Sequence, residues 1–117
     1  RDLLEQALAA NVNHFGADHP TVAIRRSNLA LVYKDLGDYQ RARDLLEQAL
    51  AADVTQFGED HPTVAIRRSN LASVFLDLDR KEEARIQFQA AYDIFLQNLG
   101  LNHPNTKVVQ SWLDSIS

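Results

Sequence analysis

The stretch TVAIRRSNLA occupies positions 21–30 and recurs unchanged at 63–72. The stretch RDLLEQALAA at 1–10 recurs in the same way at 43–52. Both recurrences are 42 residues apart, and 30 of the 42 positions in 1–42 are identical in 43–84. A third, diverged copy begins at Arg85 and keeps the register through Gly100, His103 and Pro104. A fixed period of this length indicates a repeat architecture, in which each copy folds as one supersecondary unit.

The pattern within each copy predicts two helices. The first begins at Pro20, because proline is favoured at the first helical position, and either Asp18 or His19 is its N-cap. Gly37 ends this helix and Gly58 ends the second one. Apolar residues recur at spacings of three and four, and no stretch alternates with period two, so we expect no strand. The expected helices span 1–14, 20–36, 39–56, 62–78, 81–98 and 104–116.

A helix pair of this size cannot bury its apolar stripe alone, but stacked pairs can bury it between them. We therefore predict an all-α solenoid of stacked antiparallel helix pairs. The predicted organisation is a single domain over 1–117, with a half repeat at 1–16, repeats at 17–58 and 59–100, and a C-terminal capping helix within 101–117. A cap is expected to be polar on its outer side, as are Gln110, Ser111, Asp114 and Ser115.

Composition argues against several classes of function. The 117 residues include no cysteine, which excludes disulfides, cysteine-ligated zinc and thiol catalysis. The formal net charge of −4 disfavours binding to nucleic acid or to an anionic membrane surface. No apolar run approaches the roughly 20 residues of a membrane span. The chain also lacks methionine, so we expect it to be a piece of a longer protein.

No motif in the sequence predicts catalysis or a cofactor. The chain has neither a glycine-rich phosphate loop nor a recognisable Ser/His/Asp arrangement, so we expect a protein that is not an enzyme. His19, His61 and His103 recur with the period of the repeat. They are therefore expected about one helix pair apart, too far for each to bond one zinc ion at ~2.1 Å. A structural role at the start of a helix is the better interpretation, and we expect no metal site.

The repeated positions resemble the tetratricopeptide repeat. In the first copy the resemblance is carried by Asn28, Leu29, Ala30, Tyr33, Gly37, Tyr39, Ala42, Leu46 and Ala49. The second copy keeps Leu71, Ala72, Phe75, Ala84, Phe88 and Ala91. The period and the Gly-x-x-His-Pro loop are most similar to the long repeats of kinesin light chains and bacterial helical-repeat arrays. Two departures are Arg26 in place of the family's aromatic residue and Asp79 in place of a turn glycine. The resemblance implies a right-handed superhelix that acts as a non-catalytic protein-interaction scaffold.

The resemblance also implies that the first helices line a concave groove for a peptide. The matching positions are Ile24, Ser27, Asn28, Leu31, Lys34, Ile66, Ser69, Asn70, Ser73, Leu76, Val108, Ser111, Trp112 and Ser115. The amides of Asn28 and Asn70 can each donate and accept, so they could hold a peptide backbone of any sequence, or they could bond a neighbouring loop. Trp112 is either an anchor for the peptide or part of the terminal cap. Both pairs of alternatives stay open at the level of sequence.

A second hypothesis belongs to a different class of function, a self-assembling structural module. The first expected helix has no partner before it and would expose an apolar stripe of Leu3, Leu4, Ala7, Leu8 and Val12. An uncovered stripe invites association, here into a closed homodimer. On either hypothesis the expected partner is a protein or peptide of unknown identity, not nucleic acid or a membrane, and the expected location is cytoplasmic.

Overall fold

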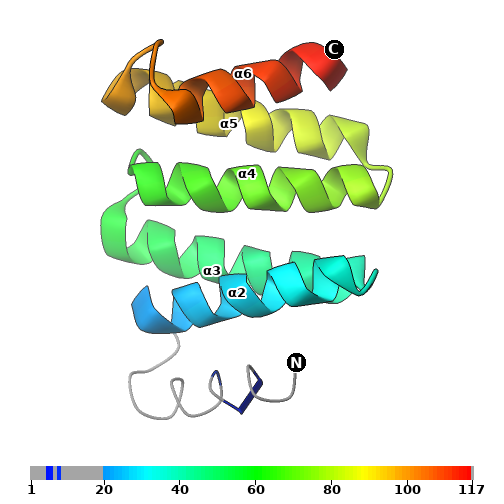
Figure 1. The fold of residues 1–117 in the computed structure, drawn as a ribbon. Helices are drawn as coiled ribbons and strands as arrows, with labels where there is room; N and C mark the ends of the chain where they lie inside the picture. Colours follow the sequence, from blue (N-terminus) through cyan, green and yellow to red (C-terminus); the bar gives the residue numbers. More distant parts are fainter. Residues whose placement is uncertain (1–4, 7, 9–19, 117) are drawn as a thin grey trace. The chain divides into compact units, whose positions relative to one another are not determined.

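The computed structural model describes residues 5, 6, 8 and 20–116 (Figure 1). All regular secondary structure in these residues is α-helix, which confirms the predicted all-α class. The chain divides into two compact units, unit 1 over Arg1–Gly58 and unit 2 over Glu59–Ser117. The division coincides with the predicted junction between the repeats at 17–58 and 59–100.

Unit 1 contains α2 (Pro20–Asp35) and α3 (Tyr39–Phe57), which pack against each other as an antiparallel pair (Figure 1). Residues 5, 6 and 8 are also helical. The contact between the two helices is built on small side chains, because Ala23 of α2 clusters with Ala49 and Ala52 of α3. Small residues at a helix contact allow a short distance between the helix axes.

Unit 2 contains α4 (Pro62–Asp77), α5 (Lys81–Leu99) and α6 (Pro104–Ile116). The middle helix, α5, packs against both α4 and α6. Its Phe88 is among the largest fully buried side chains, as are Leu71 and Val64 of α4. Burying a side chain of this size stabilises the fold by about 1.5–3 kcal/mol relative to exposing it. From α2 onward, each observed helix ends within one residue of its predicted end.

Histidine side chains cap the two helices of unit 2 that begin with a proline, α4 and α6. His61 is the N-cap of α4, and its Nδ1 accepts a hydrogen bond from the backbone N–H of Thr63 at 3.0 Å. His103 Nδ1 accepts in the same way from the N–H of Asn105 at 3.1 Å. The predicted structural role is confirmed for these two histidines. Asp18 and His19, the alternatives for the N-cap of α2, lie outside the described residues, as does most of the expected helix at 1–14.

The turns inside the two helix pairs share one hydrogen-bond pattern but differ in the residue that bends the chain. Gly37 has a φ of +81°, and Asp79 takes its place after α4 with a φ of +60°. In both turns the next N–H reaches back to the last helical turn, from Asp38 to Tyr33 at 2.9 Å and from Arg80 to Phe75 at 2.8 Å. This is the Schellman ending of a helix, and its left-handed residue favours glycine. Asp79 therefore carries backbone strain that Gly37 avoids.

Arg85 of α5 fastens the end of α6. Its Nη2 donates to the carbonyl oxygen of Ile116 at 2.9 Å, and its guanidinium also pairs with Glu82. The last carbonyl groups of a helix lack partners within the helix and carry the negative end of its dipole. One cation on α5 therefore satisfies the carbonyl group of Ile116 at the end of α6.

We predict that Asp79→Gly raises the free energy of unfolding by about 0.5 kcal/mol. The relief of left-handed strain, about 1–2 kcal/mol, exceeds the entropic cost of glycine, about 0.5–1 kcal/mol. The reciprocal change, Gly37→Ala, should lower it by about 1 kcal/mol, although no atom lies within 4 Å of the added Cβ. Urea unfolding followed by circular dichroism measures both variants. A loss of stability in Asp79→Gly would show that Asp79 is held by more than its backbone conformation.

We also predict that Arg85→Met reduces the protection of the last turn of α6 against amide hydrogen exchange. The lost hydrogen bond and dipole interaction should contribute about 1 kcal/mol. Arg80→Met is the matched control, because among the described residues the Arg80 side chain pairs with Glu83 alone, at 3.7 Å, in a partly exposed ion pair. Equal effects of the two variants on α6 would contradict the capping role of Arg85.

Candidate functional site

Unit 2 contains a groove formed by all three of its helices. The groove has a volume of about 310 Å³. We call it the unit 2 groove, and the residues that line it are Ile66, Ser69, Asn70, Phe95, Asn105, Val108 and Val109. These residues come from α4, α5 and α6, so the packing of α5 against its two neighbours creates the site.

The floor and the walls of the unit 2 groove are apolar. Phe95 of α5 is buried, with only 2% of its surface exposed. Ile66 of α4 and Val108 of α6 remain 40% and 57% exposed, so their side chains are accessible to a ligand. None of the lining side chains carries a charge. A ligand that enters the groove would therefore meet hydrocarbon, amide and hydroxyl groups and no charged side chain.

Two asparagines supply the polar groups that are available in the unit 2 groove. Neither the Asn70 nor the Asn105 side-chain amide hydrogen-bonds another described residue. In contrast, the hydroxyl of Ser69 donates to the carbonyl oxygen of Ala65 at 3.0 Å. Each amide offers both donors and an acceptor. Of the two alternatives for Asn70, a hydrogen bond to a neighbouring loop or helix end is not observed within the part of the chain that the structure describes. Its amide is therefore available to a ligand.

The unit 2 groove brings together some of the positions that the resemblance implied and leaves others apart. Ile66, Ser69, Asn70 and Val108 line it. Ser73, Leu76, Ser111, Trp112 and Ser115 do not. The lining residues that were not anticipated are Phe95, Asn105 and Val109. The resemblance implied groove residues only on the first helix of each repeat, so it did not indicate Phe95, which lies on a second helix. The seven-residue spacing from Phe88 to Phe95 places both on one face of the helix, but it does not indicate which of them borders a groove.

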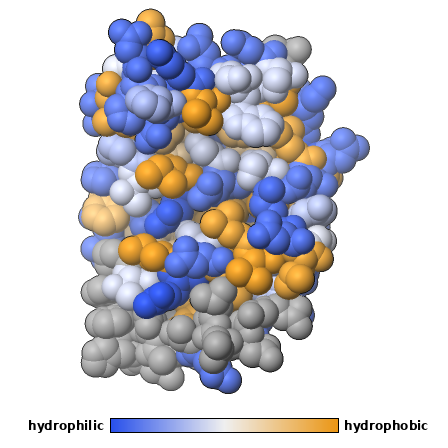
Figure 2. All heavy atoms as spheres, viewed as in Figure 1, coloured by the Kyte–Doolittle hydropathy of each residue, from blue (hydrophilic) through white to orange (hydrophobic). Residues whose placement is uncertain are grey.

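The equivalent positions of unit 1 do not line a described cavity of that unit. Ile24 and Leu31 are 49% and 44% exposed, and Asn28 is also exposed. Lys34 is half-buried. Ser27 differs from the expectation, because it is only 4% exposed whereas its counterpart Ser69 lines the unit 2 groove. Exposed apolar residues therefore occur at several places, and Figure 2 shows such patches separated by polar residues on the face viewed.

Trp112 has features of both of its predicted roles. Its ring stacks on Phe88 of α5, with the ring centroids 5.7 Å apart and the planes inclined by 6°. Trp112 nevertheless remains 44% exposed. It therefore covers part of the α5 surface and also presents an aromatic surface outward. It lies one helical turn beyond Val108, which belongs to the wall of the unit 2 groove.

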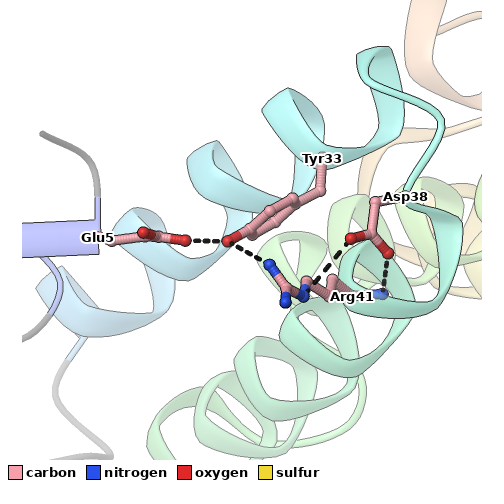
Figure 3. A network of polar contacts seen from close by, with 4 residues as sticks. All are labelled: Glu5, Tyr33, Asp38 and Arg41. Atoms are coloured by element: carbon pink, nitrogen blue, oxygen red, sulfur yellow. Dashed lines mark hydrogen bonds and ion pairs between the residues drawn. The ribbon is translucent and has the colours of Figure 1, made fainter. Parts of the chain in front are cut away.

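A polar network in unit 1 joins Glu5, Tyr33, Asp38 and Arg41 (Figure 3). Two of its residues, Tyr33 and Arg41, also line a smaller cavity of about 190 Å³. The Tyr33 hydroxyl donates to Glu5, and Arg41 Nη1 donates to the same hydroxyl at 3.4 Å. Arg41 also pairs with Asp38 at 3.4 Å and lies over the Tyr33 ring, 5.3 Å from its centroid. Two effects raise the pKa of Tyr33 above its ordinary value: the hydrogen bond to Glu5, which is the larger, and burial of the hydroxyl group. The hydrogen bond with Tyr33 raises the pKa of Arg41.

The proposed self-association stripe falls mostly outside the described residues. Leu3, Leu4, Ala7 and Val12 lie outside them, and Leu8 is half-buried. The stripe therefore stays a prediction. Within the described ranges, no group of three or more histidine, aspartate or glutamate side chains could hold a metal ion. No described helix combines the length and the apolar character that crossing a membrane requires.

Comparisons with known proteins identify relatives of this fold. Residues 1–54 match a family model described as Tetratricopeptide repeat, and residues 64–105 match a second model with the same description. None of the curated protein sequences matches the chain. Among solved structures, a kinesin light chain-like protein of Podosopora anserina with nearly identical TPR-like repeats is 26% identical, with a TM-score of 0.83 for one crystal structure, of a variant, and 0.81 for another. BtubC from P. vanneervenii is 25% identical, with a TM-score of 0.82.

These matches cover 98% of this chain in every case. They cover 54% and 55% of the two P. anserina chains and 45% of BtubC. The chain therefore spans about half the length of the solved relatives that it matches.

We predict that the Tyr33 network makes stability fall in alkaline solution. The pKa of Tyr33 is raised in the folded state, whereas an unfolded tyrosine titrates near pH 10. Between these two pKa values the folded chain keeps a proton that the unfolded chain has lost, so the free energy of unfolding decreases with pH. The contribution of Tyr33 to the free energy of unfolding is fully present below about pH 10 and is lost as the pH rises through the pKa of Tyr33 in the folded state. Thermal unfolding and tyrosinate absorbance, each measured against pH, test this.

Tyr33→Phe should remove this component of the pH dependence. Tyr39→Phe is the control, because it removes a tyrosine that does not belong to the network. The assignment of this pH dependence to Tyr33 is wrong if Tyr33→Phe loses as much stability at alkaline pH as Tyr39→Phe and the unmodified chain do.

Proposed function

Because the chain belongs to the tetratricopeptide repeat family, we propose that it is a non-catalytic interaction scaffold whose unit 2 groove binds an extended peptide segment of a partner protein. Repeats of this family generally mediate protein–protein interaction. The observation that carries the proposal is the groove itself, with a buried phenylalanine as its floor and the amides of Asn70 and Asn105 at its sides.

The arrangement suits an extended peptide for two reasons. An extended backbone presents both N–H and C=O groups at its edges, and an asparagine amide pairs with both kinds of group. A side chain of the same peptide can then enter the apolar space between Ile66 and Val108. Recognition through backbone groups supplies affinity, and the pocket for the side chain supplies specificity.

The site is carried by helices, so little ordering is needed when a peptide binds. Ile66 and Asn70 lie on α4, and Asn105 and Val108 lie on α6. Both helices pack against α5, which holds the floor residue. Side chains on packed helices lose less conformational entropy on binding than side chains on a loop, and this preorganisation favours affinity. The expected partner is a protein or peptide, and a cytoplasmic location stays a prediction.

The test is selection of peptides from a phage-displayed random library, followed by measurement of their affinity by titration calorimetry. We predict that the double variant Asn70→Ala, Asn105→Ala weakens the binding of selected peptides by about tenfold or more. Each lost hydrogen bond contributes about 0.5–1.5 kcal/mol, and 1.4 kcal/mol corresponds to a factor of ten.

The matched control is Asn102→Ala. Asn102 is an exposed asparagine in the turn before α6 and does not line the groove. This control should leave the affinity unchanged. Selected peptides that bind the double variant as tightly as the unmodified chain would overturn the assignment of the groove.

A further inference from the structure

Helix α5 presents two phenylalanines on one face, and their surroundings differ. Phe88 and Phe95 are seven residues apart, so they point to the same side of the helix about 10.5 Å from each other along its axis. Both are buried, with 1% and 2% of their surfaces exposed. The space above Phe95 is the open unit 2 groove, whereas the ring of Trp112 lies above Phe88.

The open place above Phe95 has the chemistry for an uncharged side chain. The groove has a volume of about 310 Å³. It lies at the low end of the ~300–1,000 Å³ range of small-molecule sites, which limits how much of a ligand it can enclose. Because none of its lining residues is charged, a carboxylate or ammonium group would lose its hydration there without gaining an ionic partner. An aliphatic side chain meets no such cost.

The place above Phe88 is already filled by an aromatic side chain of the same chain. The Trp112 ring is nearly parallel to the Phe88 ring, at a centroid distance of 5.7 Å, which is a stacked contact. Trp112 follows Val108 by one helical turn on α6. The ring thus covers Phe88 one helical turn from Val108 in the wall of the groove.

We propose that the unit 2 groove accepts one aliphatic side chain of its partner peptide, above Phe95, and that Trp112 limits it to one by occupying the neighbouring place above Phe88. This inference rests on the proposed function, because it specifies the ligand of the same groove. It assigns to Trp112 a role in specificity, in addition to its packing on α5. The partner segment should carry a single leucine, isoleucine or valine anchor and no charge at that position.

The experiment uses the same phage-displayed random library on the unmodified chain and on variants. On the unmodified chain, selected peptides should share one aliphatic position. Replacing that residue with alanine, aspartate or lysine should weaken binding by about tenfold or more. Ile66→Asp, which places a charge in the wall of the groove, should abolish selection. Ile86→Asp is its control, because Ile86 is 64% exposed and does not line the groove.

On Trp112→Ala the selected peptides should share a second apolar position, because the place above Phe88 becomes open. Circular dichroism shows whether this variant is folded. Trp112→Val removes most of the ring while keeping an apolar contact with Phe88, and it should give the same result if Trp112→Ala does not fold.

Three outcomes would overturn the inference, and they can be told apart from failure of the proposed function. Peptides with a charged anchor whose binding still requires Asn70 and Asn105 would refute the aliphatic class alone. A single apolar position on both the unmodified chain and the folded Trp112 variants would refute the role of Trp112. If no selected peptide depends on Asn70 and Asn105, the proposed function fails, and this inference fails with it.

Discussion

The close packing of helices through small side chains is the constraint on which the rest of each unit depends. In unit 1, Ala23 meets Ala49 and Ala52, and in unit 2 the alanines at 72, 84 and 91 are fully buried. A larger side chain at such a contact would either force the helices apart or overpack the core. Because α5 is held close to both α4 and α6, its Phe95 becomes the floor of a groove whose walls stand on those neighbours.

Near-identical sequence does not lead to identical chemistry in the two units. The twelve positions that differ between 1–42 and 43–84 include three of the four residues of the Tyr33 network: Tyr33, Asp38 and Arg41 correspond to Phe75, Arg80 and Glu83. Only unit 1 can therefore form the tyrosine–arginine contact at these positions, and Arg80 pairs instead with Glu83 at 3.7 Å. In the opposite sense, Ile66, Ser69 and Asn70 are identical to Ile24, Ser27 and Asn28, yet the three residues of unit 2 line a groove within their own unit.

The last helix keeps the register of the repeat but changes its chemistry. Ala65 and Ala72 of α4 are fully buried, and the equivalent positions of α6 are Lys107 and Asp114, both exposed. Charged residues at these positions would be costly to bury against a further helix. This pattern agrees with the expectation of a capping helix at 101–117, which stays a prediction. The same helix supplies Val108 to the groove and Trp112 to the surface of α5, so the diverged third copy also shapes the candidate site.

The sequence alone was sufficient for the class of the fold, for the ends of α2 to α6 and for a structural role of His61 and His103 at helix starts, because helical period, proline, glycine and capping residues act over a few neighbouring positions. It left open whether the histidine or the residue before it is the N-cap, and the structure identified the histidine. The sequence also pointed to Ile66, Ser69, Asn70 and Val108 as residues of one surface. The packing decided the rest. Whether Ser27 is buried, whether Phe95 and Asn105 join the groove, and whether Trp112 turns toward Phe88 depend on how three helices cross and on the bulk of side chains distant in the chain. No local pattern encodes these contacts, because each is a property of several helices together.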